Sequence, residues 1–202
     1  MAVLVPASRL GRWLENFVAR HGETVLDVVD GSLVGTGADS STFVAALPFS
    51  RAYAGAPDAG AFVAECVAPP EWGVLLVRKG GFAVARLAGT AILESKVGQR
   101  HVQARTKAGG QSQQRFARRR DNQARVAFEA AADHAARLIG SVPVLVVGGD
   151  GPAVDAALAD ARLRLVAGRV VGEFLTVPDP RRSVLEEAIL DACSVRMTVT
   201  NA

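Results

Sequence analysis

A glycine pair followed by a glutamine is the part of this sequence best suited to chemistry. Gly109, Gly110 and Gln111 stand between two basic stretches, and none of their side chains titrates. Glycine allows backbone angles that are closed to other residues, so the chain can approach another molecule closely here. Backbone N–H groups can stabilise the oxyanion that forms when water attacks an ester, and a fixed amide can place that water. Taken alone, three such residues more often form a flexible surface loop, so the case for a hydrolytic loop with Gly109, Gly110 and Gln111 as catalytic residues depends on the sequence around them.

This loop lies in the most basic segment of the chain. From Lys96 to Arg120 there are eight basic residues and no aspartate or glutamate, which leaves 15 basic and 20 acidic residues elsewhere. The overall charge of +3 therefore divides into +8 in this segment and −5 in the remainder. Most charge runs are solvated faces, but eight like charges without internal compensation repel one another. A concentrated positive patch on a mildly acidic body is typical of proteins that bind a polyanion.

Amide side chains gather in the same segment. All six glutamines of the chain lie between Gln99 and Gln123. An amide both donates and accepts hydrogen bonds without carrying charge, so amides among arginines suit contacts with phosphates, riboses and base edges. We expect eight residues to contact RNA: Arg105, Lys107, Arg115, Arg118, Arg119, Arg120, Asn122 and Arg125.

The pattern around the loop predicts strands before it and a long helix after it. Three apolar runs, at 72–77, 82–87 and 91–97, are separated by glycine turns and indicate an antiparallel meander. A helix is expected from Gln113 to Ile139, with an apolar stripe along its second half and a polar, basic first half. One helix would therefore be buried at one end and carry the loop at the other.

The remaining segments predict an α/β fold with a mixed sheet, because hairpins come first and helices then alternate with strands. Helical patterns lie at 8–20, 59–66, 151–161 and 180–193. Strands are expected at 24–29, 42–47, 143–148 and 195–199, with one or two more in 163–177, while 31–41 is expected to be a turn region. The proline pair at 69–70 divides the chain into residues 1–70, an N-terminal appendage or an outer layer of the same domain, and a domain of residues 71–202.

The composition of the chain argues against a membrane protein, a secreted protein and a metalloprotein. Half of the 202 residues are hydrophobic, which is enough for one core or for a core with a small appendage. No uncharged stretch is long enough to span a bilayer, and the first residues lack the pattern of a signal peptide. Cys66 and Cys193 form no metal or redox spacing, and the three histidines lie far apart in the sequence. We therefore expect a cytoplasmic, reduced protein without a membrane partner, a metal site or a cofactor.

The segment Gly-Gly-Gln-Ser-Gln-Gln-Arg-Phe-Ala-Arg, residues 109–118, resembles the catalytic tip of eukaryotic and archaeal class-1 peptide-chain release factors. The longer stretch to Gln123 also resembles the release-factor-like peptidyl-tRNA hydrolases of ribosome quality control, of the Vms and ankyrin-zinc-finger type. Size and Ala/Arg/Val-rich composition are similar to those of a short actinobacterial Vms-like branch. The resemblance is specific over about residues 72–139 and weaker over 140–200.

This resemblance implies an RNase-H-like mixed β-sheet flanked by helices, with the Gly-Gly-Gln loop projecting from it. It implies that Gln111 places the water that releases nascent chains from peptidyl-tRNA on stalled ribosomes or large subunits. Unlike the release factors, the chain has no room for both a codon-reading domain and a C-terminal partner-binding domain, so stop-codon recognition is not expected. Cleavage near the tRNA 3′ end is the alternative reaction that the quality-control relatives imply.

Two other functions stay open on the sequence alone. A non-enzymatic tRNA- or rRNA-binding factor associated with the ribosome would need the arginines but no particular residue at position 111. A metal-free nuclease on the same fold is the weaker alternative, because nucleases of the RNase H type rely on clustered carboxylates and no such cluster stands out here. The sequence predicts neither the oligomeric state nor what residues 1–70 contact.

Overall fold

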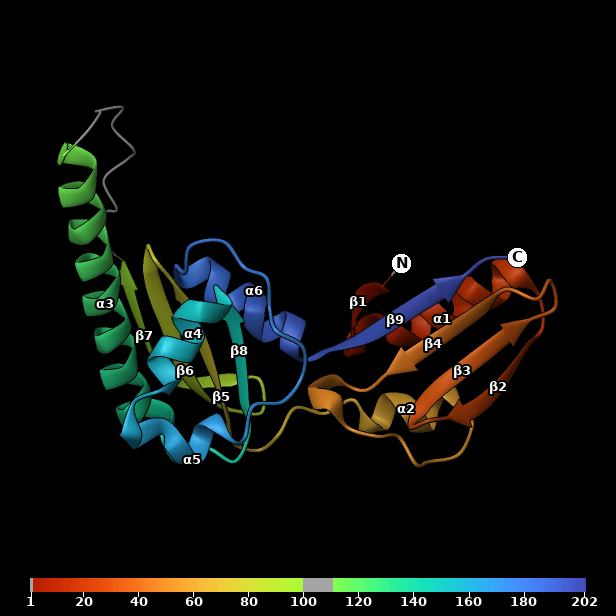
Figure 1. Cartoon of the computed structure of the whole chain (residues 1–202). Helices are drawn as coiled ribbons and strands as arrows, with labels where there is room; N and C mark the ends of the chain where they lie inside the picture. The colour runs from red at the N-terminus through yellow and green to blue at the C-terminus, as the bar shows by residue number, and fades with distance from the viewer. Residues whose placement is uncertain (1, 100–110) are drawn as a thin grey trace. The chain divides into compact units, whose positions relative to one another are not determined.

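The computed structural model describes residues 2–99 and 111–202, with side chains described for 3–99 and 125–202. Within these residues six α-helices and two β-sheets form a mixed α/β protein (Figure 1). The chain divides into two compact units. The first holds Met1–Ala68 and Ile189–Ala202, and the second holds Pro69–Ala188.

The second unit is built on a four-stranded sheet of order β7-β6-β5-β8. Strands β5 (Trp72–Arg78), β6 (Gly81–Ala88) and β7 (Ala91–Gln99) form an antiparallel meander, and β8 (Leu145–Gly149) joins β5 in parallel. The chain between β7 and β8 includes the long helix α3 (Gln111–Ile139). The meander, the helix and the mixed sheet are therefore confirmed.

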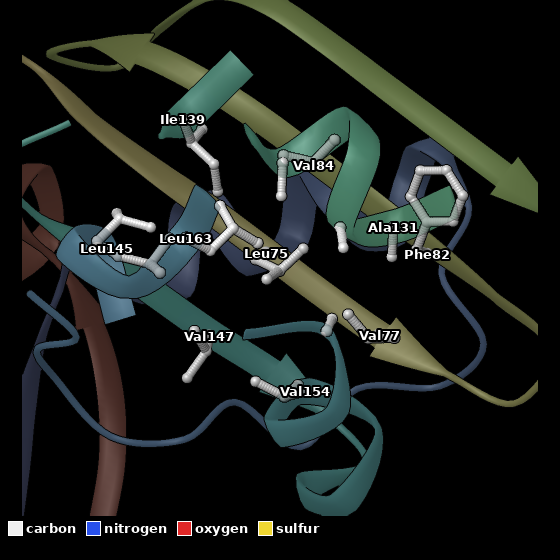
Figure 2. Packing of buried hydrophobic residues seen from close by; sticks show 14 of the residues in the cluster. Leu75, Val77, Phe82, Val84, Ala131, Ile139, Leu145, Val147, Val154 and Leu163 are labelled. Carbon is white, nitrogen blue, oxygen red and sulfur yellow. The ribbon is translucent and has the colours of Figure 1, made fainter. Parts of the chain in front are cut away.

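Apolar side chains fill the space between this sheet and its helices. Figure 2 shows side chains of β5 and β6 packed with those of α3 and of α4 (Gly151–Leu158). Alternation along the strands places Leu75 and Val77 in this cluster, while Val74 and Leu76 are fully buried on the opposite face. Helix α6 (Arg182–Ala192) begins beside β7, where Arg182 Nη1 donates a hydrogen bond to Ser95 Oγ at 3.0 Å.

The first unit is built on a five-stranded antiparallel sheet of order β1-β9-β4-β3-β2. One core cluster joins it to α1 and α2. In that cluster the Trp13 and Phe17 rings meet the Phe43 ring edge-on, at centroid distances of 5.4 and 4.9 Å. Its elements are β1 (Ala2–Pro6), α1 (Ala7–His21), β2 (Thr24–Val29), β3 (Ser32–Gly37), β4 (Thr42–Ala46), α2 (Ala59–Glu65) and β9 (Ser194–Thr200), with a 3₁₀ turn at Pro48–Ser50.

The last strand of the chain belongs to the first unit. The division at residue 70 placed all of 71–202 in one domain, whereas β9 pairs with β1 on one side and β4 on the other. Residues 189–202 therefore complete a sheet that the first residues begin. Pairing between the two ends of a chain leaves no local pattern, so the division by composition alone did not show it.

Two local expectations were wrong. The glycine-rich segment 31–41 contains β3, where a glycine at position 35 leaves room for the Phe43 ring of the neighbouring strand. Residues 163–177 contain no full strand but a 3₁₀ turn (Ala161–Leu163), the short helix α5 (Arg164–Ala167) and isolated bridges at Val170 and Leu175. Leu163 and Val166 are buried at helical spacing, which explains this difference.

The position of β9 can be tested with a truncation inside its core. Met197 is fully buried, so Met197→Ala should lower the unfolding free energy of the first unit by about 2–5 kcal/mol. Amide hydrogen exchange in β3 and β4, measured together with exchange in β5 and β6, reports the two units separately. Thr198→Ala is the matched control, since this side chain is exposed on the same strand and should matter by less than about 0.5 kcal/mol. Equal effects of the two substitutions, or faster exchange in β5, would contradict the two-unit division.

Candidate functional site

The C-terminal half of α3 packs on the sheet of the second unit. The buried side chains of this half are mostly alanines: Ala127, Ala131, Ala132, Ala135, Leu138 and Ile139. Small side chains let the helix lie close to the strands. At the end of α3 the helix lies close to β5, because a Cβ atom on Gly73 would lie 2.8 Å from Ile139 Cγ2. Residues 127–139 therefore fix the direction of the whole helix.

The other half of α3 extends past the sheet, as Figure 1 shows. Its described side chains become exposed at Arg125 and Val126. At 1.5 Å per residue, the 16 residues from Gln111 to Val126 span about 24 Å. Gln111 is the first residue of α3, two positions earlier than the sequence predicts. The glutamine of the motif therefore stands at the end of the helix that is farthest from its anchor.

Most of the other expected site residues have no described side chain. Gly109, Gly110, Arg105 and Lys107 lie outside the described residues. The next group lies on α3 where only the backbone is described: Arg115, Arg118, Arg119, Arg120 and Asn122. Positions 115, 118, 122 and 125 follow one another at three- and four-residue spacing, which places them along one face of a helix. The helix therefore brings these predicted RNA contacts onto one projecting element.

Arg125 is the expected RNA contact with a described side chain, and it has a partner, Glu129, whose four-residue spacing on the helix is the signal that predicts such a pair. Its Nη1 donates to Glu129 Oε1 one turn along the helix at 2.5 Å. Both side chains are more than half exposed, at 64% and 57%. Exposed pairs at this spacing contribute about 0.3–0.5 kcal/mol to stability, so a phosphate can displace Glu129 at small cost. The ion pair holds the Arg125 side chain on the helix surface and leaves it able to bind a phosphate.

Two contacts tie α3 to the strands that precede the loop. Arg137 Nη1 lies 2.9 Å from Glu94 Oε1 on β7, the strand that leads into the loop. The half-buried His134 ring stacks on Phe82 of β6, with a centroid distance of 5.5 Å and an interplanar angle of 26°. The element before the loop and the element after it are thus connected to each other below the projecting half of α3.

The remaining reactive side chains that the structure describes show neither a metal cluster nor an activated thiol. Among the side chains that the structure describes, no three or more His, Cys, Asp or Glu residues are grouped to hold a metal ion. Burial raises the pKa of the Cys66 and Cys193 thiols to about 11, so both stay protonated and weakly nucleophilic near neutral pH. None of the helices in the described part of the chain is long and apolar enough to cross a bilayer.

A model of the Actinobacteria/chloroflexi VLRF1 release factors matches residues 70–198. No curated protein matches the chain. Among solved structures, the archaeal translation termination factor aRF1 is 13% identical with a TM-score of 0.38, over 95% of this chain and 63% of that one. Pelota of Archaeoglobus fulgidus is 12% identical with a TM-score of 0.29, over 94% and 62%. A further archaeal protein is 13% identical with a TM-score of 0.36, over 78% and 50%. The chain thus spans less than two thirds of each of these three structures.

The anchor of α3 can be tested at the close contact between Ile139 and Gly73. Ile139→Ala removes a fully buried side chain and should lower the unfolding free energy of the second unit by about 2–5 kcal/mol. Arg137→Ala on the same helix removes one exposed ion pair and should cost less than about 1 kcal/mol. Hydrogen exchange of α3 and β5 measures both variants. If Ile139→Ala were no more harmful than Arg137→Ala, the packing against Gly73 would not be what holds the helix.

Proposed function

Because the chain belongs to the actinobacterial and chloroflexi VLRF1 release-factor family, we propose that it hydrolyses peptidyl-tRNA to release nascent chains on stalled ribosomes or large subunits. The match over residues 70–198 carries this proposal, since it includes the Gly-Gly-Gln motif, α3 and the sheet that anchors α3. The projecting half of α3 supports this proposal, because a single helix is narrow enough to reach a peptidyl-tRNA ester that lies deep inside the ribosome.

The reaction in this proposal is hydrolysis of a carboxylic ester. Water placed by the Gln111 amide attacks the ester carbon, and the bond from that carbon to the tRNA 3′ ribose oxygen breaks. The nascent chain leaves with a free carboxyl group, and a proton restores the ribose hydroxyl. Gly109 and Gly110 shape the tip so that the backbone can approach the ester. The first N–H groups of α3, beginning at Gln111, have no acceptor within the helix and can stabilise an oxyanion.

RNA binding in this proposal rests on the basic residues around the tip. Arginine forms paired hydrogen bonds with phosphate, and a helix face with arginines at three- and four-residue spacing can follow a phosphate backbone. Asn122 adds an uncharged donor and acceptor. The RNase-H-like arrangement of the sheet, the projecting loop and the cytoplasmic location are parts of the same proposal. The residues assigned to RNA are Arg105, Lys107, Arg115, Arg118, Arg119, Arg120, Asn122 and Arg125.

A second candidate function is a ribosome-associated factor that binds tRNA or rRNA without catalysis. The charge of +8 between Lys96 and Arg120 favours it, because that charge attracts RNA whatever residue occupies position 111. The two functions differ in what they require of Gln111, which gives the test between them.

Gln111→Ala should lower the rate of nascent-chain release from isolated ribosome–peptidyl-tRNA complexes by at least about 100-fold, because the water is no longer held in place. Binding to the complexes should stay near the wild-type level, since no charge is lost. Gln123→Ala is the matched control, as it removes an amide from the same helix at a position with no proposed catalytic role. Undiminished release by Gln111→Ala would reject the catalytic role, and absence of release by the wild-type chain would favour the binding factor.

A further inference from the structure

Several cationic residues lie at one edge of the second sheet, at the end of β7 from which the chain continues to the Gly-Gly-Gln loop. Arg78 at the end of β5 pairs with Gly81 at the start of β6, and Gly81 pairs with Gln99 at the end of β7. These three strand ends form what we call the loop edge, because Gln99 is the last described residue before the Gly-Gly-Gln segment. Lys79 lies in the turn between β5 and β6, and so it belongs to the loop edge.

The segment before α6 crosses the same edge. The Asp179 carboxylate lies 3.3 Å from Arg78 Nε, at the end of β5. Three residues later, Arg182 reaches Ser95 on β7. Arg181 therefore stands between the β5–β6 turn and β7, although it lies far from both in the sequence. Its carbonyl oxygen accepts the Leu185 N–H, which fixes Arg181 as the residue directly before the first residue of α6.

Most of the cations whose side chains the structure describes in the second unit already have a protein partner. Carboxylates pair with Arg78, Arg86, Arg125, Arg137, Arg162 and Arg182, and the Ser141 and Val142 carbonyls accept from Arg169. Among the side chains that the structure describes in this unit, the exposed cations without a hydrogen bond or ion pair to another described residue are Lys79, Lys96, Arg164 and Arg181.

The distribution of these free cations is uneven. Lys79, Lys96 and Arg181 lie on or beside the loop edge, whereas Arg164 lies on α5, near the start of β8 and at the other end of the sheet (Figure 1). An unpaired cation keeps its full attraction for an outside anion. Free positive charge is thus available at the base of the projecting helix, in addition to the arginines along that helix.

We propose that Lys79 and Arg181 bind backbone phosphates of the tRNA acceptor arm, while the tip of α3 reaches the ester at the tRNA 3′ end. This rests on the proposed function, which fixes the substrate. The tip lies about 24 Å beyond the first buried turn of α3. The acceptor arm is an A-form RNA helix that leads directly into the 3′ end, so phosphates that face the loop edge while the tip is at the ester belong to this arm. The two cations orient the arm and are not catalytic residues.

The test uses the full chain with the double variant Lys79→Glu/Arg181→Glu and the control Arg164→Glu. The probe is an acceptor-arm RNA minihelix with a free 3′ end. The double variant should bind the minihelix at least about tenfold more weakly, which corresponds to about 1.4 kcal/mol of binding free energy. The slope of log affinity against log salt should fall by about 0.9 for each phosphate that the protein no longer neutralises. Arg164→Glu should match the wild-type chain in both quantities.

A release assay separates this inference from the proposed function. At saturating protein the double variant should release nascent chains at the wild-type rate, and only the half-saturating concentration should rise. If the wild-type chain binds the minihelix and releases nothing, the function fails while the docking result stands. Wild-type-like binding by the double variant, or no binding by the wild-type chain, overturns the docking. An equal loss of binding to large subunits without tRNA, with the minihelix affinity unchanged, would assign the cations to ribosomal RNA and overturn it too.

Discussion

The close packing of the alanine-rich half of α3 on the central strands of the second sheet is the interaction on which the site depends. Helix formation has a costly nucleus and then propagates residue by residue. Residues 127–139 supply the nucleus through burial, so the helix can continue into a sequence in which Arg118, Arg119 and Arg120 repel one another. Without this anchor nothing in the described residues would determine the direction in which Gln111 is presented.

The distribution of charge follows from the same arrangement. Cations near the body of the second unit are mostly neutralised by nearby carboxylates, as in the Arg137–Glu94 and Arg86–Glu71 pairs. No aspartate or glutamate lies between Lys96 and Arg120, and the basic residues of this segment flank the loop or lie on the projecting half of α3. Uncompensated charge is therefore concentrated where the proposed substrate would arrive, and the acidic remainder of the chain discourages RNA from binding elsewhere.

The sequence predicted the features that leave a local pattern. The meander of β5, β6 and β7 follows from apolar runs between glycine turns, and α3 follows from its apolar stripe. Features made by distant segments were not predictable. The position of β9 between β1 and β4 joins the two ends of the chain, and β3 was hidden by its glycines, of which Gly35 accommodates the Phe43 ring. At the proposed site, the motif predicts a role for Gln111, but the contacts of Asp179 with Arg78 and of Arg182 with Ser95, on either side of Arg181, arise only when the chain folds.

The central claim is that the loop hydrolyses the ester and leaves the RNA chain intact. The most direct measurement is to map the 3′ end of the tRNA and the C-terminus of the peptide that leave the complexes in one turnover. The account predicts a tRNA with its complete 3′ end and a free hydroxyl, together with a nascent chain that ends in a free carboxyl group. A shortened tRNA, with its terminal nucleotides still attached to the peptide, would contradict the account and assign the activity to strand cleavage.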